Sequence, residues 1–184
     1  MFNIMPEQLP IVTYGNKVLR KKTKPVTEIS DDLIALIDNM FYTMHEADGV
    51  GLSAPQINEN ISVALVDISL DEKYKDVKPL ILINPEILET HGESVYKEGC
   101  LSFPELRGDV NRPKKIYLRY YDLDMKDIKE EFDELQARVI QHEIDHLNGK
   151  LFIDYFTLDM LTESKLLLSN IKKRNIDTRY PILK

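Results

Sequence analysis

Cysteine is scarce in this chain of 184 residues, because Cys100 is the only one. A single thiol cannot form an internal disulfide, so stability has to come from an apolar core. Long apolar runs are also missing, and no stretch approaches the ~18 uninterrupted apolar residues of a membrane span. The N-terminus lacks the basic start and apolar segment of a secretory signal. We therefore expect a cytoplasmic protein without a membrane partner.

Net positive charge is absent as well, since the formal net charge is -7. This balance argues against a surface built to bind nucleic acid, and we expect no specific DNA partner. Residues 165–184 differ from the rest, with six basic residues against Asp177 alone. This basic tail is a candidate for contact with an anionic partner, such as the ribosome near the peptide exit.

The composition, 43% hydrophobic and 30% charged, is typical of one compact domain. We expect residues 1–184 to form that single domain, with residues 157–184 supplying a C-terminal helix and the basic tail. Apolar residues at helical spacing, with Ser30 as N-cap, predict the first helix. The three predicted helices cover residues 31–47, 133–147 and 158–173.

β-rich runs separated by proline, glycine and asparagine predict strands over residues 61–68, 80–83, 93–96 and 115–121. The charged segment 71–78 is expected to be a solvated loop. Because helices and strands do not alternate, the pattern favours an α+β fold with mostly antiparallel strands. The helix over residues 133–147 is apolar on two faces, so we place it centrally, between the N-terminal and C-terminal helices.

This central helix contains the sequence His-Glu-x-x-His, from His142 to His146. Two histidines four residues apart lie on one face of a helix, where they can chelate one metal ion. Leu135 and Val139 lie on the same stripe and could line an apolar pocket that reaches the metal. Asp145 lies outside this stripe, and we expect it to support the ligands or to form a structural ion pair, not to bind the metal.

A third ligand is needed for a metal site. Acidic residues after His146, such as Asp154, Asp159 or Glu163, are one source. Cys100, upstream in Glu98-Gly99-Cys100-Leu101-Ser102, is the other, because thiolate binds borderline and soft divalent metals strongly.

Three segments resemble the signatures of the peptide deformylase family, in the same order. They are Gly49-Val50-Gly51-Leu52-Ser53-Ala54-Pro55-Gln56, Glu98-Gly99-Cys100-Leu101-Ser102 and Gln141-His142-Glu143-Ile144-Asp145-His146. The segment beginning at Tyr14 is similar to the family's N-terminal part, so the resemblance covers residues 14–152. Ser53 stands where the family usually has alanine, and Arg138 and the 71–78 segment are less typical.

The resemblance implies a metal-dependent hydrolase that removes the N-formyl group from the N-terminal methionine of nascent polypeptides and releases formate. Cys100, His142 and His146 would hold ferrous iron, which zinc, nickel or cobalt can replace. These ligands leave a fourth position open for water and a net charge of about +1, which favours hydroxide as the nucleophile.

By the same resemblance, Glu143 is the general base and then the general acid. The Gln56 side chain and the Leu101 backbone N–H would stabilise the oxyanion. The substrate-binding candidates surround an apolar methionine slot and an edge for an extended peptide. They are Val50, Gly51, Tyr96, Gly99, Arg107, Leu135 and Val139.

Two other functions use part of the same pattern. A zincin-like endopeptidase shares His-Glu-x-x-His but takes its third ligand from residues after His146. A non-catalytic, metal-stabilised domain that binds the ribosome would need neither Glu143 nor Gln56.

Overall fold

The computed structural model describes residues 5–183. Its α-helices are α1 (Asp31–Glu46), α2 (Glu134–Leu147) and α3 (Leu158–Lys172). Its strands are β1 (Gly51–Ser53), β2 (Val63–Val66), β3 (Leu80–His91), β4 (Ser94–Cys100), β5 (Phe103–Arg112), β6 (Lys115–Tyr121) and β7 (Asp127–Asp133). The three predicted helices are confirmed to within one residue at each end. No helix within residues 5–183 has the length and apolar character needed to cross a membrane.

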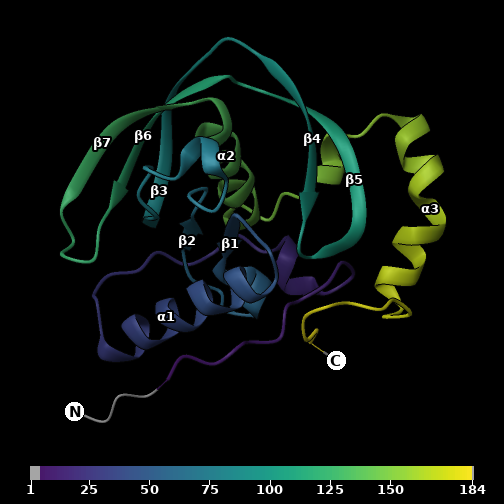
Figure 1. Ribbon diagram of the computed structural model, residues 1–184, viewed down its shortest axis with the longest axis horizontal. Coiled ribbons are helices and arrows are strands. Elements are labelled where there is room, and N and C mark those ends of the chain that lie inside the picture. The colour runs from purple at the N-terminus through teal and green to yellow at the C-terminus, as the bar shows by residue number, and fades with distance from the viewer. Residues whose placement is uncertain (1–4, 184) are drawn as a thin grey trace.

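Two antiparallel sheets flank α2, as Figure 1 shows. One has five strands in the order β1-β2-β3-β6-β7, and the other is the β4–β5 hairpin. Every strand pairing within them is antiparallel. The α+β prediction with mostly antiparallel strands around a central helix is therefore confirmed.

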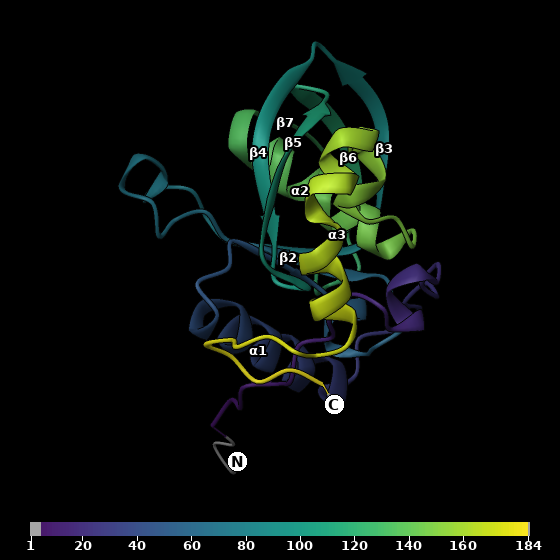
Figure 2. The ribbon, with the colours of Figure 1, turned by 90° about the vertical axis from the view of Figure 1, so that its right-hand side faces the viewer.

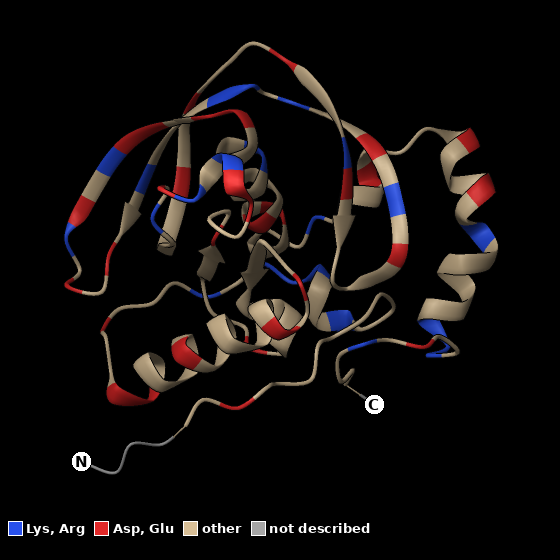
Figure 3. Ribbon diagram, viewed as in Figure 1, with Lys and Arg blue, Asp and Glu red and all other residues tan. Residues whose placement is uncertain are grey.

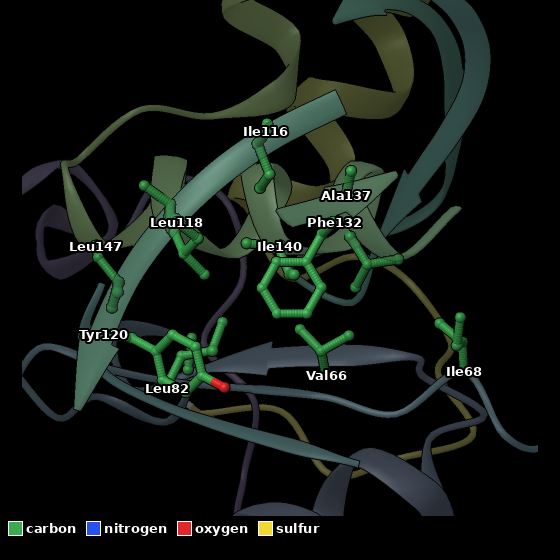
Figure 4. Packing of buried hydrophobic residues seen from close by; sticks show 13 residues of the cluster. Val66, Ile68, Leu82, Ile116, Leu118, Tyr120, Phe132, Ala137, Ile140 and Leu147 are labelled. Carbon is green, nitrogen blue, oxygen red and sulfur yellow. The ribbon is translucent and has the colours of Figure 1, made fainter. Parts of the chain in front are cut away.

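The main core lies between α2 and one face of the five-stranded sheet (Figure 4). Ala137 and Ile140 of α2 are fully buried against strand side chains such as Leu82 and Leu118. The helix ends as predicted, with Gly149 in the left-handed conformation (φ 72°) that glycine adopts without strain. A Cβ at Gly149 would also lie 2.7 Å from the Arg20 backbone oxygen. Ala137 and Ile140, on the apolar face of α2 away from the histidines, thus anchor the helix that carries both histidines.

Helix α1 begins where Ser30 caps it, because the Ser30 hydroxyl accepts a hydrogen bond of 3.2 Å from the Leu33 N–H. Its buried face contributes Ile37, Met40 and Met44 to a second core with β1 and β2. This packing fixes the loop that connects α1 to β1.

Helix α3 lies outside the β4–β5 hairpin and packs on β5 (Figure 2). Gly108 of β5 permits this approach, because a Cβ there would collide with the Phe156 ring just before α3 and lie 2.9 Å from Met160 Cε of α3. The chain then turns back toward the N-terminal segment, where Ile11 and Ile182 form an isolated parallel bridge. The predicted tail therefore packs on the body of the protein.

Strand prediction was incomplete. β1, β5 and β7 were not predicted. β3 extends to His91 instead of residue 83, and β4 extends to Cys100 instead of residue 96. Segment 71–78 lies between strands as predicted, with a short 3-10 helix at Glu72–Tyr74.

Candidate metal centre and active site

The structure brings the three predicted metal ligands together. Cys100 ends β4, and His142 and His146 lie one turn apart on α2. One ligand atom from each lies within 4.8 Å of the others, and Cys100 Sγ lies 3.3 Å from His146 Nε2. Within residues 5–183 this is the one group of such side chains that could hold a metal ion.

The downstream acidic residues do not join this group. Asp154 pairs with the Arg20 guanidinium at 2.5 and 2.9 Å and accepts a hydrogen bond from the Leu151 N–H. Asp159 and Glu163 lie on the exposed surface of α3. Within residues 5–183, no acidic residue after His146 therefore completes the ligand arrangement of a zincin-like endopeptidase.

The donor set fits a divalent transition metal, because one thiolate and two imidazoles match the softness of such ions. Burial lowers the pKa of His146 well below its ordinary value, which keeps this imidazole neutral as a ligand must be. Burial also opposes charge on His142, but hydrogen bonds with Cys100 and Glu98 outweigh it and raise the pKa of His142. The negative groups around His142 thus stabilise a positive charge at this position, which a bound divalent ion would supply.

Glu98 is the most connected side chain beside the ligands, and sequence reasoning gave it no role. Its carboxylate accepts hydrogen bonds from His142 Nδ1 (3.0 Å), from Arg112 (2.7 and 3.1 Å) and from Arg138 (2.9 Å). Burial alone would raise the pKa of Glu98, but the hydrogen bonds from His142 and Arg112 lower it to about 2. A carboxylate on the second ring nitrogen orients a ligating histidine and fixes its tautomer. The available signal was position, because Glu98 precedes Cys100 by two residues on one strand.

Arg112 extends this network away from the metal centre. Its side chain is 3% exposed, and its guanidinium also donates to Asp145 at 2.6 Å. The ion pair predicted for Asp145 is thus confirmed. Tyr155 donates to the same Asp145 oxygen at 2.9 Å, and its ring lies under the Arg112 guanidinium. These contacts neutralise buried charges that would otherwise be costly.

Glu143 points into the site from α2 and is 3% exposed. Its Oε2 atom has no hydrogen-bond partner within residues 5–183. Burial raises the pKa of Glu143 to about 7, close to the value of an efficient general base. Gly51 makes room for this side chain, because a Cβ at Gly51 would collide with the Glu143 carboxylate and lie 2.8 Å from Val139 Cγ1.

Gln56 lies in a short 3-10 helix after β1 and is 1% exposed. Its Oε1 accepts hydrogen bonds from the Ser53 N–H (2.9 Å) and the Ser53 hydroxyl (2.8 Å). Its Nε2 lies 3.5 Å from Cys100 Sγ and donates to the Ser102 hydroxyl at 3.3 Å. The unusual Ser53 therefore holds the Gln56 amide with its donor end toward the metal ligands.

A cavity of about 470 Å³ opens beside these residues. Cys100, His142, Glu143, Gln56 and Leu101 line it. Its wall also contains every predicted substrate-binding residue, namely Val50, Gly51, Tyr96, Gly99, Arg107, Leu135 and Val139. Tyr96 and Val50 are 54% and 40% exposed at its rim, while Val139 is buried deeper. Among the lining residues that were not predicted is Tyr180, which lies far along the chain from the three motifs.

Comparison with known proteins agrees with this geometry. A family model described as polypeptide deformylase matches residues 8–160. A peptide deformylase of Chlorobium phaeobacteroides (strain BS1) is 44% identical over 174 residues, which are 95% of this chain and 94% of the relative. One from Hydrogenovibrio crunogenus is 50% identical over 151 residues, covering 82% of this chain and 87% of the relative.

Solved structures show the same fold. The crystal structure of a peptide deformylase from Legionella pneumophila aligns with a TM-score of 0.83 and 36% identity, covering 91% of this chain and 97% of that one. A Met-Ala-Ser-bound class I type b peptide deformylase from Acinetobacter baumannii aligns with a TM-score of 0.78 and 35% identity, covering 83% and 100%. Since the family model spans most of the chain and relatives match nearly its whole length, this protein belongs to the polypeptide deformylase family.

Proposed function

We propose that Cys100, His142 and His146 hold the divalent metal ion of this deformylase, which removes the N-formyl group from N-terminal methionine and releases formate. The observation that carries this proposal is the meeting of one thiol and two imidazoles within 4.8 Å beside a buried glutamate. Ferrous iron is the ion we propose for the native protein, with zinc, nickel or cobalt as substitutes. When bound, such an ion lowers the pKa of water and polarises a carbonyl oxygen.

Glu143 transfers the proton in this proposal. Its carboxylate accepts a proton from the water that attacks the formyl carbon, and then delivers it to the departing amine nitrogen as the C–N bond breaks. The buried, unpaired Oε2 atom is available for this transfer, and a pKa near 7 permits both steps at neutral pH. The water thus supplies the second oxygen of formate and two protons, one to the new amine and one to the formic acid that dissociates to formate.

Gln56 and Leu101 are the proposed donors for the formyl oxygen as it gains charge. The Gln56 Nε2 is held toward Cys100 by Ser53 and cannot turn without losing two hydrogen bonds to its Oε1. Leu101 directly follows the thiol ligand and lines the same cavity. Donors fixed in advance stabilise a developing charge better than mobile ones, because they need no reorganisation.

The substrate is proposed to be a formylated nascent peptide, which places the reaction in the cytoplasm. Its methionine side chain would fit between Val50, Leu135 and Val139, and its backbone would pair along Gly51 and Gly99. At Gly99, a Cβ would meet Arg107 Nη1 at 3.1 Å, so Arg107 lies over this edge. The A. baumannii relative, whose structure is described as Met-Ala-Ser-bound, supports a methionine-led peptide as the ligand.

The deciding experiment is formate release from formyl-Met-Ala by metal-loaded protein, with casein as a control substrate for endopeptidase activity. Glu143→Ala should abolish formate release while metal content stays near one ion per chain. Glu163→Ala, on the exposed surface of α3, is the matched control and should retain full activity. Casein cleavage without formate, or undiminished turnover by Glu143→Ala, would refute the proposal.

Basic residues of α3 and of the segment after it, blue in Figure 3, are the proposed contact with the ribosome. Lys165, Lys173 and Arg179 are exposed there. Because the tail packs on the body of the protein, truncation would perturb the fold, and charge reversal is the cleaner test. Co-sedimentation with ribosomes should weaken in Lys165→Glu/Lys173→Glu, and unchanged binding at low salt would exclude this surface.

A further inference from the structure

The C-terminal segment reaches the active site through one side chain. The Tyr180 hydroxyl donates a hydrogen bond of 2.7 Å to the Leu101 backbone carbonyl, across 79 residues of sequence. Tyr180 is partly buried and lines the active-site cavity. The hydroxyl therefore contacts the residue whose N–H is a proposed oxyanion donor.

The backbone around Tyr180 is itself fixed. Pro181 O accepts a hydrogen bond from the Ile11 N–H at 2.8 Å, and the Leu183 N–H donates to Ile11 O at 2.9 Å. The Thr178 hydroxyl donates to Tyr180 O at 2.6 Å. Figure 2 shows this last segment, in yellow, running back below α3. The phenol is thus carried by a segment that is hydrogen-bonded on both sides of Tyr180, and not by a free tail.

The N-terminal segment, residues 11–14, also holds the backbone beside the two proposed oxyanion donors, Gln56 and Leu101. The Val12 N–H donates to Gln56 O at 2.7 Å, and the Tyr14 N–H donates to Ser102 O at 2.9 Å. Ile11, Val12 and Tyr14 therefore connect the C-terminal segment, the Gln56 turn and the β4–β5 turn, respectively. All three carry groups that face the cavity.

Leu101 and Ser102 form the tip of the β4–β5 hairpin, between the paired Cys100 and Phe103. The tip has three supports around Leu101. The Leu101 side chain packs against Gly49, where a Cβ would come within 2.8 Å of Leu101 Cδ1. Tyr180 holds the peptide plane after Leu101, and Tyr14 holds the next one. The pairing of Cys100 with Phe103 holds the chain before Leu101, and the Tyr180 hydrogen bond holds the peptide after it. The backbone dihedrals of Leu101, which set the direction of its N–H, are therefore constrained from both sides.

We propose that Tyr180 is a positioning residue for deformylation, which holds the Leu101 N–H in the direction that stabilises the oxyanion. This inference rests on the proposed function of Leu101. The phenol hydroxyl does not touch the reacting atoms in this scheme, and it acts only through the Leu101–Ser102 peptide. Its effect should therefore appear in the transition state and not in substrate binding.

The test is Tyr180→Phe, which keeps the ring and removes only the hydroxyl. We expect kcat for formyl-Met-Ala to fall about fivefold, the loss that one hydrogen bond of ~1 kcal/mol would give, with KM within about twofold of wild type. Amide hydrogen exchange in residues 101–103 and at Tyr14 should accelerate by a similar factor, measured on metal-loaded protein. Tyr120→Phe is the matched control, because its part-buried hydroxyl donates to Glu130 in the five-stranded sheet.

The outcomes separate the two proposals. If the wild-type protein releases formate but Tyr180→Phe has an unchanged kcat, only the role of Tyr180 is overturned. Equal rates of amide hydrogen exchange in Tyr180→Phe and Tyr120→Phe would have the same consequence. A raised KM with unchanged kcat would also overturn it, since that pattern indicates substrate binding. No formate release by the wild-type, metal-loaded protein would overturn the proposed function, and this inference with it.

Discussion

Glu98 offers the sharpest test of how this site is held together. Glu98→Gln keeps the shape of the side chain but replaces one carboxylate oxygen with an amide group that donates. One of the two oxygens accepts from His142 and Arg112, and the other accepts from Arg112 and Arg138, so either replacement removes two acceptor contacts. The change also leaves the Arg112 and Arg138 guanidinium groups, 3% and 5% exposed, with less compensating charge. Breaking a buried ion pair from one side costs about 3–5 kcal/mol.

Metal affinity should fall in the same variant, because the carboxylate orients the His142 ring. Loss of such a partner typically weakens metal binding about 10–100-fold. Urea unfolding of the metal-loaded protein measures the loss of stability, and titration against a competing chelator measures the loss of metal affinity. Glu131→Gln is the control, since its pair with Lys115 is exposed and worth less than about 1 kcal/mol. Equal unfolding midpoints and equal metal affinities in the two variants would refute this account of Glu98.

Three further outcomes follow from the same contacts. Gly51→Ala should lower stability by about 1–3 kcal/mol and reduce formate release, because the new Cβ collides with Glu143; a fully active variant would contradict this. The pKa of Glu98 is lowered from 4.5 to about 2, so the folded protein binds fewer protons there. The contribution of Glu98 to the free energy of unfolding should be complete above pH 4.5 and be lost as the pH falls toward 2. Urea unfolding at several pH values measures this loss, and Glu98→Gln should lack this pH dependence. Removing the metal with a chelator should lower the melting temperature and formate release together, with about 2.7 kcal/mol of stabilisation restored at a free ion concentration of 100 Kd.

The helices were predictable because their signals are local. Ser30 and the apolar spacing after it determine α1, and Asn148-Gly149 marks the end of α2. Three strands, β1, β5 and β7, were not predicted. With only three residues, β1 is too short to show a periodic pattern. In β5, buried positions alternate regularly but include Gly108 and Arg112, which do not look apolar in the sequence. In β7, an edge strand that pairs only with β6, Phe132 is the one buried residue, so its sequence has a charged surface pattern.

For the site, the spacing of His142 and His146 on one helix face was enough to propose a metal centre, and the three ordered motifs were enough to suggest the family. These signals lie within short segments, where helix geometry alone relates the side chains. Only the tertiary structure decided that Cys100, and not a downstream carboxylate, meets the histidines. The Glu98 network and the Tyr180 contact likewise needed the fold, because buried hydrogen bonds between distant residues depend on how strands and helices pack and leave no periodic pattern in the sequence.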